Sequence, residues 1–399
     1  MNAQNTPVHI RLWHREFWQM ALANLLLSMS VYILYPLLPQ CLEDNGYFTA
    51  VETGGSMAVF ALGLFLFGPF CSFLVQHYRR NKVCLWSIVI MAACLGVLWY
   101  LFDGGWPSAT FPLVMLLRLV QGATFGLAQM ILSSTLVIDT CESYLRTEAN
   151  HSMSWFGRFA LSLGPLAGLF ATRHFHMPVP DVLWMAVGCA LFAFLLIRMV
   201  KFPFRAPSDH VTLFSTDRFW LGSGFILFVN LLLISVAVGM VLALATTIDF
   251  YAGIMVGYLF ALLACRFVFR DAELKSEVVS GLILFLAALL LLMVRPTASS
   301  DFIAATLIGI AIGLIGSRFL LFFIKLSRHC QRGTSQSTYM LAWESGIALG
   351  VGITYALPAS RYTTSLTTSL ILVSLAMLIY NLYTHCWFEH HKNRYSFIL

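Results

Sequence analysis

Residues 111–137 read FPLVMLLRLVQGATFGLAQMILSSTLV, an apolar run with a single charged residue, Arg118. A helix that crosses the hydrocarbon core of a bilayer needs roughly 20 apolar residues, and this run meets that length. One face of the helix, at spacings of three and four residues, carries Arg118, Gln121, Gly122, Phe125 and Gln129. Because polar groups that face lipid are costly, we expect this face to line a central cavity.

Apolar runs of this length repeat along the whole chain. The 399 residues are 59% hydrophobic and 11% charged, whereas soluble domains are roughly 25% charged. This composition excludes a water-soluble core and predicts an all-α membrane protein. The twelve predicted membrane helices are Phe17–Pro39, Thr53–Val75, Val83–Phe102, Phe111–Val137, Met153–Ala171, Val182–Val200, Phe219–Ala245, Phe250–Phe269, Val278–Val294, Phe302–Ile324, Ser337–Leu357 and Leu366–Trp387.

The positive charges between these runs predict the orientation of the chain. If the loops alternate between two sides, one side carries nearly all the lysines and arginines, and the other carries only Arg173, Arg295 and Arg361. By the positive-inside rule, both termini are then cytoplasmic, in a multi-pass protein of the inner or plasma membrane. The first residues lack the layout of a signal peptide, so we expect the first helix to be retained.

The longest stretch between predicted helices divides the chain into two halves. It contains two prolines and several charges, and short motifs recur on either side of it: Asn24-Leu-Leu-Leu returns as Asn230-Leu-Leu-Leu. Such internal repeats are typical of transporters whose site lies at the repeat interface. The predicted units are an N-terminal six-helix bundle at 1–200, a cytoplasmic linker at 201–218 and a C-terminal six-helix bundle at 219–399.

Several classes of partner and activity have no support in the residues. The net charge of +6 is spread in small groups, which argues against nucleic acid. The nine cysteines are scattered without a C-x-x-C pair and the histidines lack an ordered ligand set, so we expect no metal and no cofactor. No clustered nucleophile and base and no H-E-x-x-H motif is present, so we do not expect an enzyme. We expect a monomer in a lipid bilayer.

Two motifs resemble those of the major facilitator superfamily. Arg118-Leu-Val-Gln121-Gly122 matches the family's R-x-x-Q-G motif, and Gly157 followed by Gly164-Pro165-Leu-Ala-Gly168 is similar to the glycine-proline motif of its drug and metabolite antiporters. The resemblance implies two pseudo-symmetric six-helix bundles that rock around a central site by alternating access. It also implies a small-molecule substrate, with protons as the coupling ion.

A third family motif is altered in this chain. The loop between the second and third predicted helices should read G-x-L-A-D-R-x-G-R-R-K, but residues 72–82 read SFLVQHYRRNK. The basic end is kept as Arg79, Arg80 and Lys82, whereas the aspartate is replaced by Gln76. The chain therefore departs from the motif at the acid that takes part in the family's charge-assisted latch to the neighbouring half.

Four ionisable side chains stand out within the predicted helices: Arg118, Arg158, Arg318 and Glu344. Each costs at least about 2.5 to 3.5 kcal/mol at a helix centre, so each is a functional candidate. By resemblance, Arg118 takes part in proton movement, and the alternative is that it braces the bundle through backbone carbonyls. Glu344, in low dielectric, is the candidate proton carrier. The alternative is a static ion pair with Arg318, which lies at a similar depth.

The excess of cations over anions inside the helices suggests a substrate with a carboxylate, phosphate or sulfate. Arg158 would contact such an anion, or else extend its guanidinium to the cytoplasmic interface. The full set of candidate substrate-binding residues is Asn24, Tyr32, Arg118, Gln121, Gln129, Arg158, Asn230, Arg318 and Glu344. The two asparagines have an alternative role as hydrogen-bonding links between helices. Acids at the helix ends, including Glu43 and Asp139, are expected to be solvated.

The prediction for function is a secondary active transporter that works by alternating access. It is expected to carry out proton-coupled efflux of a small amphipathic or anionic molecule. One alternative is a proton-coupled importer or facilitator of a sugar or organic acid, which would use the same architecture. The second alternative is a membrane receptor that has lost transport.

Overall fold

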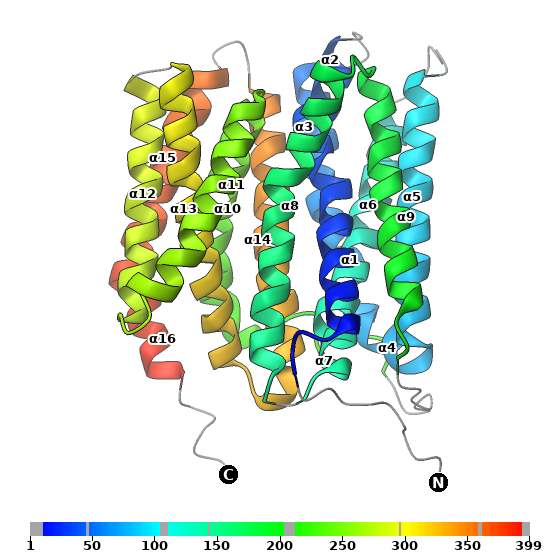
Figure 1. Cartoon of the computed structure of the whole chain (residues 1–399), viewed down its shortest axis with the longest axis vertical. Helices are drawn as coiled ribbons and strands as arrows, with labels where there is room; N and C mark the ends of the chain where they lie inside the picture. Colours follow the sequence, from blue (N-terminus) through cyan, green and yellow to red (C-terminus); the bar gives the residue numbers. More distant parts are fainter. Residues whose placement is uncertain are drawn as a thin grey trace.

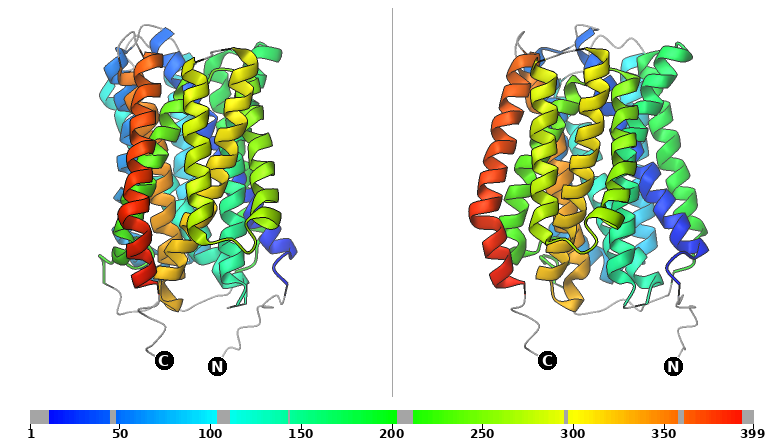
Figure 2. Two further views of the ribbon diagram at one scale, coloured as in Figure 1. Left: turned by 90° about the vertical axis from the view of Figure 1, so that its left-hand side faces the viewer. Right: turned by 60° about the vertical axis from the view of Figure 1, so that its left-hand side comes forward.

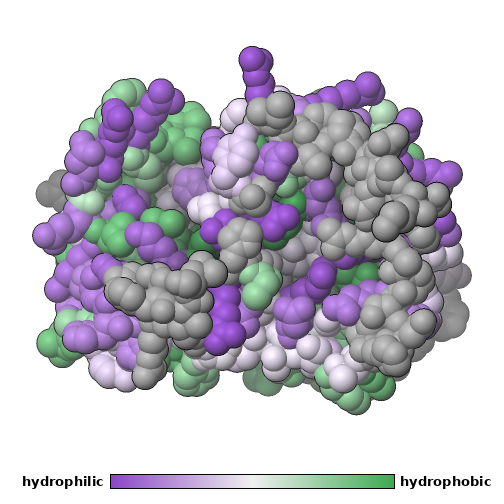
Figure 3. Space-filling view, turned by 90° about the horizontal axis from the view of Figure 1, so that it is seen from below, coloured by the Kyte–Doolittle hydropathy of each residue, from purple (hydrophilic) through white to green (hydrophobic). Residues whose placement is uncertain are grey.

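The computed structural model describes residues 11–44, 48–103, 111–142, 144–202, 212–294, 297–357 and 361–392, and these are almost entirely helical. The helices run side by side, roughly parallel to one another. The helix α1 begins on the same face of the molecule on which α16 ends (Figure 1). Hydrophilic side chains are spread over the described part of that face (Figure 3). Half of the predicted linker, residues 203–211, lies outside the described residues, as do Arg205 and Arg295 among the loop cations.

The described part of the N-terminal bundle contains nine α-helices and three 3-10 or π-helical segments. In chain order they are α1 (Arg15–Tyr32), α2 (Leu34–Asp44), α3 (Ala50–Leu66), η1 (Gly68–Phe70), α4 (Cys71–His77), α5 (Arg80–Asp103), α6 (Phe111–Ile131), η2 (Leu132–Leu136), α7 (Val137–Thr140), α8 (Arg146–His174), η3 (Val179–Asp181) and α9 (Val182–Met199). Several of these join end to end into one membrane helix. The π-helical segment η2, for example, continues α6 into α7.

The C-terminal bundle repeats this plan. Its elements are η4 (Gly222–Gly224), α10 (Phe225–Leu244), α11 (Ile248–Leu263), η5 (Ala264–Val268), α12 (Leu274–Val294), α13 (Ala298–Leu326), η6 (His329–Gln331), α14 (Arg332–Ala356), α15 (Arg361–Ile379), η7 (Tyr380–Thr384) and α16 (His385–His391). Figure 1 shows the two bundles side by side, with α8 and α14 at the junction between them. Across this junction α3 packs along α14, and α8 packs against α11 and α13.

Ten helical stretches of the described chain are long and apolar enough to cross a membrane. The helices α8 (29 residues) and α14 (25 residues) are not among them, yet they run the height of the bundle beside the others (Figures 1 and 2). With both counted, twelve helical stretches of the described chain run this height, ten of which meet the length and apolarity criterion. The helices α8 and α14 are more polar because they lie at the junction, where side chains meet protein instead of lipid. The predicted starts at Met153 and Ser337 were too late, because α8 begins at Arg146 and α14 at Arg332 with polar turns that an apolarity criterion omits.

The helix α14 contacts the N-terminal bundle at both of its ends. At one end, a Cβ added to Gly54 of α3 would lie 2.6 Å from the backbone nitrogen of Ala356. At the other end, a Cβ on Gly333 would lie 2.6 Å from the carbonyl oxygen of Ser134 in η2. Neither position has room for a larger residue, because the backbones themselves are in contact. The two bundles are thus in contact at both ends of α14.

Candidate functional site

The hydrogen bond between Tyr32 and Glu344 joins the two bundles near their centre. The Tyr32 hydroxyl donates to Oε1 of Glu344 at 2.6 Å, and the two residues are 0% and 5% exposed. Tyr32 is the last residue of α1, and Glu344 lies in the middle of α14. The second carboxylate oxygen, Oε2, has no hydrogen-bond partner among the described residues. A buried acceptor left without a partner is uncommon and marks a place where a proton or a ligand would bind.

Further unpartnered polar groups surround this carboxylate. The Tyr35 ring lies edge-on to Tyr32 with 5.3 Å between ring centroids, and Tyr258 and Tyr339 lie within electrostatic range of Glu344. The hydroxyls of these three tyrosines find no partner in the described part of the chain. The indole nitrogen of Trp155, whose ring is 6.2 Å from that of Tyr258, also has none.

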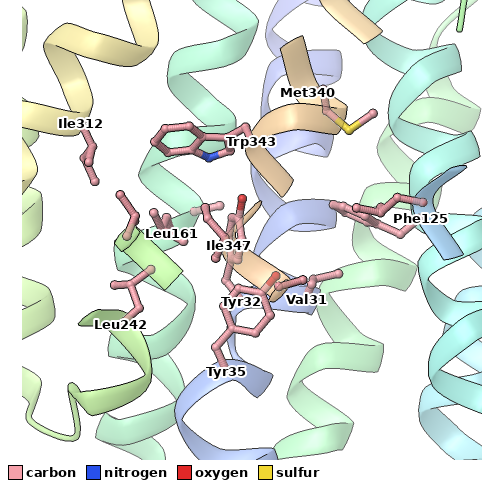
Figure 4. Close-up of a cluster of buried hydrophobic side chains, with 14 of the residues drawn as sticks. Val31, Tyr32, Tyr35, Phe125, Leu161, Leu242, Ile312, Met340, Trp343 and Ile347 are labelled. Carbon is pink, nitrogen blue, oxygen red and sulfur yellow. The ribbon is translucent and has the colours of Figure 1, made fainter. Parts of the chain in front are cut away.

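We refer to these six residues as the central cluster: Tyr32, Tyr35, Trp155, Tyr258, Tyr339 and Glu344. They come from α1, α2, α8, α11 and α14, so both bundles contribute. In Figure 4, Tyr32 lies among the buried apolar side chains of Val31, Leu161 and Ile347. The cluster thus combines one carboxylate with aromatic hydroxyl and indole groups inside an apolar core. The sequence analysis identified Tyr32 and Glu344 as candidates, but not Trp155, Tyr258 or Tyr339.

Arg118 lies in the same bundle interior but is bonded to neighbours of its own half. Its Nε donates to the carbonyl of Ser56 at 3.3 Å, and its Nη1 donates to Oε1 of Gln121 at 2.6 Å. The guanidinium also lies over the Phe60 ring, 5.0 Å from its centroid. These contacts join α6 to α3. They match the alternative in which Arg118 braces the bundle through backbone carbonyls. Arg118 is fully buried and is within electrostatic range of Tyr35, through which it adjoins the central cluster.

Arg158 connects the two bundles by a second route. Its Nη1 donates to the carbonyl of Gly313 and to the hydroxyl of Ser317, both at 2.9 Å, and both acceptors are on α13. The guanidinium stacks 4.1 Å from the Trp155 ring centroid, next to the central cluster. Because Arg158 is only 2% exposed, the predicted extension of its guanidinium to the membrane interface is wrong.

The predicted alternative of an Arg318–Glu344 ion pair is also wrong. Arg318 instead forms an ion pair with Glu277 of α12, and its Nη2 lies 3.4 Å from the carbonyl of Phe269. Glu277 is 1% exposed, so Glu344 is not the only carboxylate inside the helices. The sequence prediction missed it because the expected helix began one residue later, at Val278. Two side chains at a comparable depth in neighbouring helices need not point toward each other.

The remaining predicted polar contacts hold neighbouring helices together. Nδ2 of Asn24 donates to the carbonyl of Met153 on α8 at 2.9 Å, and Nδ2 of Asn230 donates to that of Ala376 on α15 at 3.0 Å. Gln129 of α6 donates to the hydroxyl of Ser28 at 2.9 Å. Asn24 and Asn230 therefore occupy the linking role that the sequence left open for them.

An ion pair closes one face of the bundle. Nη2 of Arg361, at the start of α15, lies 2.8 Å from Oε1 of Glu43 in α2, and Nη1 lies 3.2 Å from Oε2. The guanidinium also stacks on Tyr355, 4.8 Å from its ring centroid. We call this Glu43–Arg361 pair the outer pair. Glu43, expected to be a solvated end residue, is 28% exposed but is also paired; the signal for its partner was Arg361, one of the few cations on that side.

The opposite face is closed by polar contacts around the start of α14. The Arg218 guanidinium donates to Thr135 of η2 at 2.9 Å, and Thr334 of α14 donates to Asp217 at 3.2 Å. Beside them, Arg80 of α5 forms an ion pair with Asp139 of α7, which the sequence analysis had placed in water. These groups line a cavity of about 200 Å³.

Comparison with known proteins identifies this architecture. The family model of the Major Facilitator Superfamily matches residues 20–351. The chain belongs to the major facilitator superfamily. No curated protein sequence matches it as a relative. Similar solved structures include the human organic anion transporter MFSD10 (TETRAN), at 18% identity and a TM-score of 0.66, covering 92% of this chain and 98% of that one.

Two further transporters of this superfamily fold are similar at lower identity. The nucleoside transporter NupG is 10% identical with a TM-score of 0.65, covering 93% of this chain and 99% of its own. A bacterial homologue of the iron transporter ferroportin, in an outward-facing state, is 14% identical with a TM-score of 0.64, covering 93% of this chain and all of that one. At these identities the likeness shows the fold alone.

The superfamily motifs can now be placed in the bundle. Gly157, Gly164 and Gly168 lie on the face of α8 that packs on α1, and a Cβ at Gly164 would meet the backbone nitrogen of Ile33 at 3.1 Å. Pro165 lies inside the same helix, which continues through it. Gln76, in place of the motif's aspartate, donates to the hydroxyl of Ser72 in its own helix at 3.0 Å. The contacts to the other bundle at this face come instead from Asp217 and Arg218.

Proposed function

We propose that the chain is a secondary active transporter that exchanges a small amphipathic molecule against protons by alternating access. The two units would be the bundles at 1–200 and 219–399, which rock about the central cluster while the linker at 201–218 joins them. The observation that carries the proposal is the Tyr32–Glu344 hydrogen bond between bundles, with Glu344 Oε2 unpartnered in a buried site.

The unpartnered Oε2 of Glu344 would make closure of the two bundles depend on whether a proton or a substrate is bound there. An ionised carboxylate that is buried with one hydrogen bond is costly, and the cost falls when a proton or a second donor reaches Oε2. Both bundles can therefore close around Glu344 when it is protonated or when a substrate donates to it. Because a proton and a substrate would compete for the same oxygen, each crossing carries one or the other. That exclusivity is what exchange of substrate against protons requires.

The groups around Glu344 favour an amphipathic substrate over an anionic one. The predicted anion site rested on Arg118, Arg158 and Arg318, and each of these donates to protein acceptors. The central cluster instead offers a carboxylate, aromatic faces and hydroxyl or indole donors. These suit a molecule with an apolar body and a hydrogen-bond donor or a basic amine. Arg118 would act indirectly, through Tyr35.

The orientation follows from the loop charges. We place both termini in the cytoplasm and the chain in the inner or plasma membrane, as a monomer. The outer pair then closes the outward face, and Asp217 and Arg218 close the cytoplasmic one. Release on either side requires only one of these sets to separate.

The test is transport by purified protein in liposomes with an imposed pH gradient. Wild type should accumulate substrate against its gradient when protons run the opposite way, and Glu344→Gln should exchange substrate without responding to the pH gradient. A matched control is Glu277→Gln, a buried glutamate outside the central cluster. If Glu344→Gln still responds to the gradient, coupling through this residue is refuted. If substrate accumulates on the side toward which protons flow, the result would favour the alternative of a proton-coupled importer. If the protein binds substrate but does not move it across the bilayer, the result would favour the alternative of a receptor.

A further inference from the structure

We propose that a groove on the lipid-facing surface of the N-terminal bundle binds one anionic glycerophospholipid. The groove is a hollow of about 690 Å³ between α4, α5 and α6. It is separate from the central cluster, because its α6 residues Thr124 and Leu127 are on the helix face opposite to Arg118 and Gln129. The proposal therefore does not depend on what Glu344 binds.

The groove opens toward the lipid. Among its lining residues, Trp86 is 66% exposed and Ile90 is 44% exposed. Large apolar side chains at the surface of a membrane helix face acyl chains, and a concave apolar surface holds one chain in place more firmly than a flat one does. Leu74 and Leu127 also line the groove. The body of the groove thus fits a hydrocarbon chain.

One end of the groove is basic. His77, Arg79 and Lys82 line it at the junction between α4 and α5, on the face where α1 begins. No acidic side chain is found among the described residues that line it. Basic pockets between membrane helices at the cytoplasmic surface suit phosphate-bearing lipid head groups. The charge of the groove therefore favours an anionic head group over a zwitterionic one.

The distance between the basic end and the apolar part of the groove matches that between the phosphate and the acyl chains of a phospholipid. Lys82 and Ile90 are on the same helix, eight residues apart, which is about 12 Å along its axis. The basic end lies at the membrane boundary, and Trp86 lies between it and the hydrocarbon, the depth at which tryptophan is enriched. A lipid with its phosphate at Lys82 would place its first acyl carbons beside Trp86 and Ile90. Free phosphate would satisfy only the basic end.

The experiment is native mass spectrometry of the full chain in detergent, titrated with phosphatidylglycerol or with phosphatidylcholine. We expect one tightly retained phosphatidylglycerol on the wild type. The Arg79→Gln/Lys82→Gln double variant should bind it at least tenfold more weakly, since each basic residue contributes about fivefold near a membrane surface. The matched control is Arg266→Gln/Arg270→Gln, which removes two exposed charges elsewhere and should leave binding unchanged.

Three results of the lipid titration would overturn the proposal. They are equal retention of phosphatidylcholine, equal loss in the control double variant, and displacement of the lipid by millimolar inorganic phosphate. A second variant tests the apolar part: Trp86→Ala should weaken phosphatidylglycerol retention without changing the preference for it over phosphatidylcholine. Melting temperatures of all variants in detergent check that each remains folded. A dimer in the same spectra, lost in the Arg79→Gln/Lys82→Gln variant, would show that the occupant is a second copy and would refute the lipid.

Discussion

Breaking the outer pair should shift the transporter toward a conformation that is open on that face. Arg361 and Glu43 form a two-point contact, with N to O distances of 2.8 and 3.2 Å, and both side chains are 28% exposed. An exposed pair contributes up to about 1 kcal/mol, and the two-point geometry supports the upper end of that range. Since 1.4 kcal/mol is tenfold in an equilibrium constant, Glu43→Gln should raise the ratio of open to closed molecules about fivefold.

The population can be measured by electron paramagnetic resonance between two spin labels. Val51 of α3 and Tyr362 of α15 are exposed, at 67% and 43%, and they belong to different bundles near the outer pair. In a cysteine-free background, labels at these positions should show a longer distance whose share grows in Glu43→Gln and in Arg361→Gln. The charge-swapped double variant, Glu43→Arg with Arg361→Glu, should restore the short distance. If the swap behaves as the sum of the single variants, or if neither single variant lengthens the distance, the outer pair does not hold this face closed.

Three other changes test the packing and the site. Gly54→Val should lengthen the same label distance and abolish transport, because α3 and α14 meet there without room for a side chain; unchanged transport would refute that contact. Glu277→Ala should lower the stability by about 3 kcal/mol, since it leaves the Arg318 charge buried without its partner; the detergent melting temperature checks this, and Glu277→Gln should lose less. Tyr32→Phe should slow exchange about tenfold at neutral pH and regain rate at higher pH, because the hydroxyl stabilises ionised Glu344; a pH profile identical to the wild type would contradict this role.

Much of the fold follows from local features of the chain. The length of each apolar run, the short loops and the placement of cations predicted twelve helices, and the described elements agree with them to within a few residues. The largest errors were at the starts of α8 and α14. In α14, polar residues 334–338 are buried by neighbouring helices instead of lying in water. A rule based on apolar length cannot distinguish these two environments.

The partners of the buried charges were less predictable. Glu344 and Tyr32 were both identified as candidates, but the hydrogen bond between them joins residues 312 positions apart. Arg318 was matched with the wrong carboxylate, because depth along a helix can be counted in the sequence, whereas the direction in which a side chain points across the bundle cannot. Asp139 is similar: the π-helical segment η2 lies just before it, and Asp139 is paired with Arg80 of α5.

The sequence by itself determined that the chain spans a membrane, how many helices it has, and which few polar residues are placed among apolar ones, because each of these depends on side chains within a single helix and on the cost of exposing them to lipid. Only the tertiary structure decided that Arg158 connects α8 to α13, that Glu43 meets Arg361, and that three tyrosine hydroxyls and an indole are left unpartnered around Glu344. These features depend on the rotation of each helix about its own axis, which is set by packing against several neighbours at once.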